Sequence, residues 1–147
     1  MRNAFVTIEQ LGKTYSSKNE ELVVFEDVSF GIEKGEFVCI IGHSGCGKST
    51  ILNVLAGLDK PSHGGIIMDG KEVIGPSLDR GVVFQNYSLL PWLSTLQNVN
   101  FAVKARWPNW SKADALEHSV GVLKMVGLGH SRHKKPSELS GGMGQRG

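Results

Sequence analysis

The sequence has few cysteines, little charge imbalance and no long apolar run. Its two cysteines, Cys39 and Cys46, cannot build a disulfide framework and fit a reducing compartment. The 16 Lys and Arg residues against 14 Asp and Glu residues leave a net charge of +2, which argues against nucleic acid as the main partner. No run of about 18 apolar residues occurs and no apolar stretch opens the chain, so we expect neither a membrane-spanning helix nor a secretion signal. Together these absences predict a cytoplasmic protein.

The chain of 147 residues is long enough for one domain with a sizeable core. Its first half is predicted to be rich in strands. Apolar residues in segments 5–8 and 28–32 follow a strand-like pattern. Segment 37–41 is apolar on both faces, which predicts a strand inside a covered parallel sheet, and 82–84 is predicted as a second buried strand. Residues 66–73 predict a hairpin on an Asp-Gly turn.

Helix signals occur once in the first half and then dominate from about residue 88. Apolar residues in segment 49–56 are followed by a glycine, which predicts a helix with a glycine C-cap. Ser94 with Gln97 forms a capping box before a second helical segment. Ser111 with Asp114 repeats this device before a third. A strand–loop–helix unit is therefore followed by a mostly helical part.

The loop between the predicted strand 37–41 and the first helix matches a phosphate-binding pattern, GxxxxGK[ST], at every fixed position. Its glycines let successive N–H groups point at phosphates, and the helix adds its positive end. The Lys48 ammonium would reach the β- and γ-phosphate oxygens, and the Ser49 hydroxyl would ligate Mg²⁺. We assign no catalytic role to His43 or Cys46, and the alternative for the whole loop is a glycine-rich turn that precedes a helix by chance. The predicted nucleotide-binding loop consists of Gly42, His43, Ser44, Gly45, Cys46, Gly47, Lys48, Ser49 and Thr50.

Three further features narrow the class of phosphate-binding protein. Residues 139–145 resemble the LSGGQ signature of ATP-binding cassette (ABC) ATPases, although on their own they could equally be a helix N-terminus capped by Ser140. Segment 82–85 resembles the Q-loop of that family, where Gln85 would otherwise be a buried structural residue. Tyr15 resembles the aromatic residue that stacks on adenine, and would otherwise be surface or core. Because these features occur in the family's order over nearly the whole chain, the chain is identified as a member of the ABC ATPases.

This resemblance implies an α/β phosphate-loop fold with an antiparallel β subdomain and a helical subdomain. Residues 1–87 would form the β subdomain and the phosphate-loop core, and 88–147 the helical subdomain that ends in the signature. The implied partners are a second nucleotide-binding domain, the permease subunits and, indirectly, a periplasmic or lipid-anchored solute-binding protein, with no nucleic acid. The implied location is peripheral, at the cytoplasmic face of the inner (plasma) membrane. Leu89, Leu90 and Trp92 would dock against the permease, or alternatively pack inside the helical subdomain.

The resemblance also assigns roles to individual residues. ATP and Mg²⁺ are the implied cofactors, and Lys48 and Gln85 the implied catalytic residues. Gln85 would touch Mg²⁺ or the attacking water, so Ser49 and Gln85 are the implied metal contacts, and Tyr15 would bind the adenine. In this family two domains enclose two Mg-ATP molecules head to tail. The residues that would contact the ATP of the partner domain are Ser140, Gly141 and Gly142.

Two strings of residues narrow the resemblance within the family. Residues 41–50 and 83–92 look like the nitrate/sulfonate/taurine importer group, and most like its nitrate, nitrite, cyanate and bicarbonate members. The implied function is the ATP-binding motor subunit of an importer of a small anion, nitrate. Sulfonate or taurine uptake by the same kind of subunit is an alternative, since no residue of this subunit contacts the solute.

The sequence departs from the family at its end. ABC ATPases continue past the signature into a strand ending in Asp-Glu, a D-loop and a switch histidine, whereas this chain ends at Gly147 and has Gly144 where Lys is usual. The general base is therefore absent from the chain, and we expect the 147 residues to hydrolyse ATP no faster than background. The alternatives are a fragment of an importer motor, a non-hydrolysing nucleotide-binding fragment without a transport role, and an ABC protein outside transport.

Overall fold

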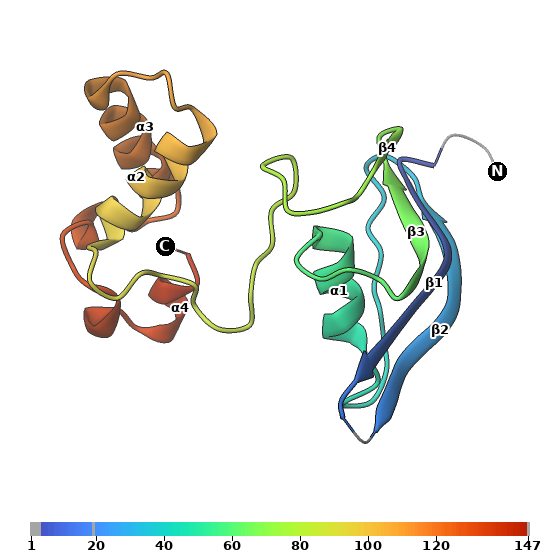
Figure 1. Cartoon of the computed structure of the whole chain (residues 1–147). Helices are drawn as coiled ribbons and strands as arrows, with labels where there is room; N and C mark the ends of the chain where they lie inside the picture. The colour runs from blue at the N-terminus through green and yellow to red at the C-terminus, as the bar shows by residue number, and fades with distance from the viewer. Residues whose placement is uncertain (1–3, 19, 147) are drawn as a thin grey trace. The chain divides into compact units, whose positions relative to one another are not determined.

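The computed structural model describes residues 4–18 and 20–146. The chain divides into two compact units, Met1–Val82 and Val83–Gly147, and each is described by itself. Figure 1 labels their helices and strands. The subdomain boundary expected between residues 87 and 88 stays a prediction.

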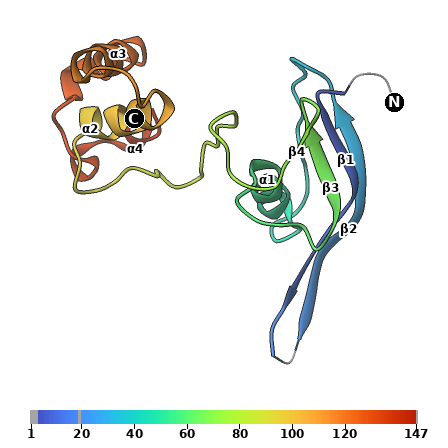
Figure 2. The ribbon, with the colours of Figure 1, turned by 45° about the horizontal axis from the view of Figure 1, so that its top comes forward.

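The first unit is a four-stranded antiparallel sheet with one helix on it. The strand order is β2-β1-β3-β4, and the bounds are β1 Val6–Ser16, β2 Glu21–Ile32, β3 His63–Met68 and β4 Lys71–Glu72. Helix α1, Lys48–Ala56, lies on one face of this sheet, as Figure 2 shows. The core forms where the buried Val54 of α1 meets the buried side chains of β1 and β3, which are Val6, Ile8, Leu11 and Ile66.

A bulge in β1 changes which side chains of this strand face the core. The side chains of Val6 and Ile8 are buried at alternate positions, but after Gln10, whose φ is +47°, the buried side chains are those of Leu11 and Lys13, on either side of the buried Gly12. The pairing of β1 with β2 shifts register between Ile8 and Leu11, as an extra residue in a strand requires. The bulge therefore turns a lysine toward the helix face of the sheet.

Three predicted elements of the first unit are confirmed. The strands predicted at 5–8 and 28–32 are present and extend further than predicted, as β1 and β2. The predicted hairpin is β3–β4, and Asp69 and Gly70 at its turn both have positive φ, 49° and 73°, as a type I′ turn requires.

Two predicted buried strands, 37–41 and 82–84, are wrong. Neither segment is a strand, and Phe37, Ile41 and Val83 have exposed fractions of 90%, 91% and 83%. A parallel strand that is apolar on both faces needs hydrogen-bonded neighbours on both sides. Among the described residues no strand pairs with either segment, and most of their apolar side chains are exposed in part or almost fully.

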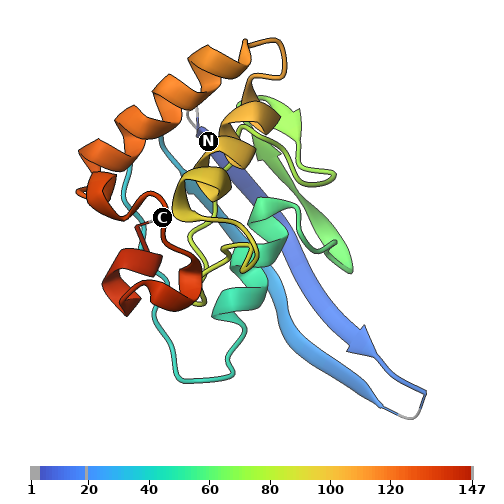
Figure 3. The same ribbon diagram turned by 90° about the vertical axis from the view of Figure 1, so that its left-hand side faces the viewer.

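The second unit is helical. Its α-helices are α2 Thr95–Arg106, α3 Lys112–Met125 and α4 Gly141–Gly144, with 3₁₀ turns η1 Gly129–Ser131 and η2 Pro136–Glu138. Helices α2 and α3 pack side by side (Figure 3) around the buried Val103, Ala115 and Leu123. Thr95 is fully buried, and its hydroxyl and its N–H both donate to the carbonyl of Lys134, at 2.9 and 2.8 Å.

Of the two capping boxes predicted for the second unit, the one at Ser94 is confirmed, whereas at Ser111 only the N-cap hydrogen bond of the hydroxyl is present and the Asp114 carboxylate accepts from that hydroxyl at 2.7 Å. The Ser94 hydroxyl accepts from the Gln97 N–H at 3.3 Å, and the Gln97 side chain accepts from the Ser94 N–H at 2.8 Å. The Ser111 hydroxyl likewise accepts from the Asp114 N–H at 3.1 Å. Caps are local devices that need only neighbouring residues, so the sequence alone predicts them.

Candidate functional site

The phosphate-binding pattern forms a loop that ends at the N-terminus of α1. Gly47, the N-cap residue, has φ +91°, a left-handed conformation that favours glycine, and a Cβ there would lie 2.8 Å from Val24 Cγ1 of β2. The first turn of α1 contains no acidic residue, and no described side chain caps it. The N–H groups and the positive end of the helix dipole are thus available to an anion.

The Lys48 ammonium lies within the curve of this loop. Its Nζ donates to the carbonyls of Gly42 and His43, at 2.8 and 2.7 Å, and lies 3.6 Å from Cys46 Sγ. A phosphate oxygen at the same position would accept from the ammonium in place of these carbonyls. The loop therefore has the donors that an anionic group such as a triphosphate needs.

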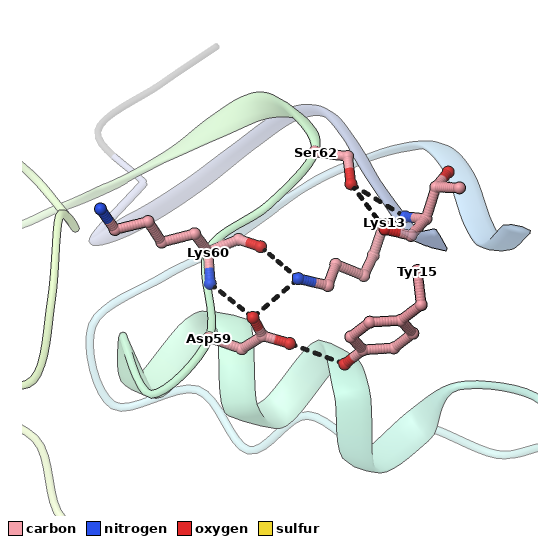
Figure 4. A network of polar contacts seen from close by, with 6 residues as sticks. Lys13, Tyr15, Asp59, Lys60 and Ser62 are labelled. Carbon is pink, nitrogen blue, oxygen red and sulfur yellow. Dashed lines mark hydrogen bonds and ion pairs between the residues drawn. The ribbon is translucent and has the colours of Figure 1, made fainter. Parts of the chain in front are cut away.

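Tyr15 belongs to a polar network that Figure 4 shows at close range. The Tyr15 hydroxyl donates to Asp59 Oδ2 at 2.6 Å, and the Lys13 ammonium donates to Asp59 Oδ1 at 2.7 Å. The same ammonium donates to the carbonyl of Lys60 at 2.7 Å and lies 4.6 Å from the centre of the Tyr15 ring. The three side chains of Lys13, Tyr15 and Asp59 are thus held against one another.

The hydrogen bonds of the network move the pKa of Asp59 and the pKa of Tyr15 in opposite directions. The hydrogen bond from Lys13, followed by that from Tyr15, lowers the pKa of the Asp59 carboxyl from its usual value. The hydrogen bond to Asp59, together with burial and the carboxylate charge, raises the pKa of the Tyr15 hydroxyl. Asp59 is therefore a carboxylate and Tyr15 a neutral phenol, which is the pairing that the network requires.

The remaining predicted site residues lie in the second unit. Gln85 is exposed on an irregular segment and does not end a strand, contrary to prediction. Ser140 occupies the N-cap position of α4 as predicted, but its hydroxyl accepts no capping hydrogen bond. Gly141 and Gly142 form the first turn of this helix, which is only four residues long. Tyr15 and the phosphate loop thus share one unit, and the Q-loop and signature residues share the other.

Sequence reasoning missed Tyr87, which connects the segment of Gln85 with the signature helix. A Cβ on Gly141 would lie 2.7 Å from the Tyr87 hydroxyl oxygen, and one on Gly144 would lie 3.2 Å from Tyr87 Cγ. The side chain of Gln145 also donates to the carbonyl of Phe84, at 3.4 Å. Gly144, the departure from the family pattern, therefore lies where the ring of Tyr87 packs.

The metal contacts predicted at Ser49 and Gln85 are a hydroxyl and an amide, and both residues are exposed. Within residues 4–18 and 20–146, no group of three or more His, Cys, Asp or Glu side chains is arranged to hold a metal ion. Mg²⁺ takes few protein ligands when it is bound with a phosphate substrate, because phosphate oxygens and water supply the others. Each of the two residues therefore offers, in its own unit, one ligand of a kind that such an ion accepts.

None of the described helices combines the length and the apolar character that crossing a bilayer would require.

A family model described as "ABC transporter" matches residues 25–147. The chain is 45% identical over 146 residues to the nitrate import ATP-binding protein NrtD of Synechococcus elongatus, covering 99% of this chain and 53% of that protein. It is 47% identical over 143 residues to the bicarbonate transport ATP-binding protein CmpD of Synechocystis, covering 97% of this chain and 51% of that protein. The chain thus spans about half the length of the curated relatives that it matches.

The fold is also similar to that of a solved structure. The dimeric ATP-binding cassette MJ0796, in a post-hydrolysis state bound to ADP and Pi, superposes with a TM-score of 0.85 at 34% identity. The match covers 96% of this chain and 66% of the cassette chain.

Proposed function

Because the chain belongs to the ABC transporter family, we propose that it forms the ATP-binding part of the motor subunit of an importer. The family and the α/β nucleotide-binding fold predicted from the phosphate loop and the signature are confirmed. The observation that supports ATP binding most directly is the Lys48 ammonium enclosed by its loop at the start of α1. The subunit would work peripherally, at the cytoplasmic face of a membrane, against its permease.

In this proposal each part of the site has a separate task. The loop N–H groups and Lys48 would hold the phosphates, Tyr15 would stack on the adenine, and Ser49 and Gln85 would contact Mg²⁺. The ion, when bound, neutralises charge on the phosphates. Residues 140–142 would meet the ATP of a second nucleotide-binding domain, an arrangement in keeping with the dimer reported for the related cassette MJ0796.

The proposed solute is nitrate, and bicarbonate is the second candidate. The support for nitrate is the 45% identity with NrtD over 99% of the chain. The support for bicarbonate is the 47% identity with CmpD. Both solutes are small, planar oxyanions with one negative charge, so measured uptake is what distinguishes them.

We expect a chimera that joins residues 1–147 to the part of NrtD that this chain does not cover, produced with its own permease and binding protein, to restore nitrate uptake in cells that lack their nitrate ATP-binding subunit. The added part is needed because residues 1–147 alone lack the general base. Uptake of labelled nitrate and of labelled bicarbonate would be followed in parallel. The matched control is the same protein with Lys48→Ala, which should restore neither. Uptake of bicarbonate but not nitrate would replace the first candidate with the second, and nitrate uptake that survives Lys48→Ala would contradict the proposed function.

We further propose that Trp92 lies on the surface that docks against the membrane subunits. Its exposed fraction is 67%, which favours docking over the alternative of packing inside the helical unit. The neighbouring Leu90 is half-buried and is held by Asn98, whose side chain accepts from its N–H at 2.7 Å and donates to its carbonyl at 3.2 Å. Trp92 is therefore presented by an ordered segment.

Trp92→Ala should lower solute uptake by roughly tenfold or more, the usual effect of losing a central aromatic contact, while ATP affinity stays within about twofold. Uptake and calorimetric ATP titration measure the two quantities. Met125→Ala is the matched control, because Met125 is an 84% exposed apolar residue of the same unit and should change neither quantity. A fall in thermal stability with Trp92→Ala, in place of a specific loss of uptake, would support the interior alternative.

A further inference from the structure

We propose that Lys13 and Asp59 are positioning residues that hold the ring of Tyr15 for the adenine base, and so set how strongly the site prefers ATP to a triphosphate without a base. The inference rests on the proposed function, in which Tyr15 binds the base. Neither residue belongs to the phosphate loop, the Q-loop or the signature.

The first observation is that Lys13 is buried, with an exposed fraction of 8%. Lysine is rarely buried unless its charge is paired. The bulge in β1 turns the side chain inward, where the carboxylate of Asp59, the carbonyl of Lys60 and the ring of Tyr15 surround its ammonium. An apolar side chain would cover the sheet equally well. The buried ammonium of Lys13 is therefore explained by its ion pair with the Asp59 carboxylate.

The second observation is that the Tyr15 ring is fixed at two points. Its hydroxyl donates to Asp59 Oδ2, and the Lys13 ammonium lies over one face of the ring at 4.6 Å from its centre. The residue is still 45% exposed. A cation over one face of an aromatic ring is attracted by the ring's negative face, which leaves the other face for stacking. Figure 4 shows the hydroxyl pointing at Asp59 beside α1.

The third observation is where Asp59 stands in the chain. It follows directly on the C-terminal turn of α1, where the N–H groups of Leu58 and Asp59 donate to the carbonyl of Asn53, at 2.9 and 3.3 Å. The N-terminus of the same helix carries Lys48 and the phosphate loop. One short helix thus joins the group that anchors the tyrosine to the group that would hold the phosphates, so both parts of a nucleotide would meet one rigid element.

From this geometry we expect that losing the anchor leaves the phosphate contacts intact and weakens only the contact with the base. A freed tyrosine side chain has to be ordered when the base binds, which weakens binding by roughly three- to tenfold. Tripolyphosphate, which has no base, should bind unchanged. The ratio of the two affinities is a quantity that general damage to the fold would not alter in this way.

The experiment is a calorimetric titration of the full chain with ATP and, separately, with inorganic tripolyphosphate. Asp59→Ala, Tyr15→Phe and Lys13→Met should each weaken ATP binding roughly three- to tenfold and leave tripolyphosphate binding within about twofold. The double variant Tyr15→Phe with Asp59→Ala should be no weaker than Asp59→Ala alone, since Asp59→Ala already removes the hydrogen bond from the Tyr15 hydroxyl. Glu26→Ala is the control for charge, as an exposed carboxylate of the same unit.

Two outcomes would overturn the positioning role alone. One is equal weakening of ATP and tripolyphosphate binding; the other is unchanged ATP binding in a folded Tyr15→Phe variant, which removes only the hydroxyl and serves if Asp59→Ala fails to fold. Two other outcomes would contradict the proposed function, in which Tyr15 binds the base. If the unaltered chain binds ATP no more tightly than tripolyphosphate, or if Tyr15→Ala changes nothing, the base contact at Tyr15 is wrong.

Discussion

Replacing Lys48 with alanine is expected to weaken ATP binding about 100-fold. Lys48 is the only lysine or arginine among residues 42–50, and its ammonium lies in the curve of the loop, against the carbonyls of Gly42 and His43. Removing one partner of a desolvated, hydrogen-bonded charge pair costs about 2–5 kcal/mol, and about 3 kcal/mol corresponds to 100-fold. Calorimetric titration with ATP, or titration with a fluorescent ATP analogue, measures the change.

The control for this prediction is Lys34→Ala, which changes the net charge equally at an exposed position of the same unit and should keep ATP affinity within about twofold. Circular dichroism would verify that the Lys48→Ala protein is folded. ATP affinity that stays the same in a folded Lys48→Ala protein would contradict the assignment of residues 42–49 as the phosphate loop.

The second large effect is expected at Gly57, which closes helix α1. Gly57→Ala should lower the free energy of unfolding by about 2–4 kcal/mol, as measured by urea denaturation followed by circular dichroism. The φ angle of Gly57 is +76°, which disfavours any residue with a Cβ. A Cβ there would also lie 2.2 Å from the carbonyl oxygen of Gly75, which is backbone and cannot rotate away.

Gly70→Ala separates these two contributions. Gly70 has a similar φ of +73°, but a Cβ there would meet nothing within 4 Å. The loss of stability should therefore be about 1–2 kcal/mol, the backbone contribution alone. Equal losses for the two variants would show that the chain near Gly75 moves aside, and that the clash at Gly57 is not real.

The parts of the fold that sequence reasoning predicted correctly are those that neighbouring residues determine. The capping box at Ser94, the glycine after α1 and the Asp69-Gly70 turn each act over a few residues. The prediction of buried strands at segments 37–41 and 82–84 was wrong because it depends on residues far away in the sequence. Their apolar character predicts burial, but burial of a strand depends on which other strands lie beside it, and a local pattern does not contain that information.

The candidate site shows the same division. The sequence pattern of residues 42–49 is continuous, so the loop before α1 could be predicted, and the Lys48 ammonium lies against its carbonyls. Its binding of phosphate stays a prediction. The anchor of Tyr15 could not be predicted, because Asp59 is 44 residues away from Tyr15 along the chain. Its position also depends on the bulge at Gln10, and a bulge has no reliable signal in a single sequence. The packing of Tyr87 could not be predicted either, because its ring contacts Gly141 and Gly144, which lie more than 50 residues later in the chain.

Because of the bulge in β1, the placement of its later side chains depends on the exact number of residues in the strand. Conservative replacements along β1 alter one contact at a time, whereas deletion of a single residue beside Gln10 would move every later side chain to the opposite face of the sheet. Lys13 would then turn away from the Asp59 carboxylate, and the hydroxyl of Tyr15 with it. A loss or gain of one residue in β1 is therefore expected to disrupt the contacts of Asp59 more than a conservative replacement at an exposed position of this strand.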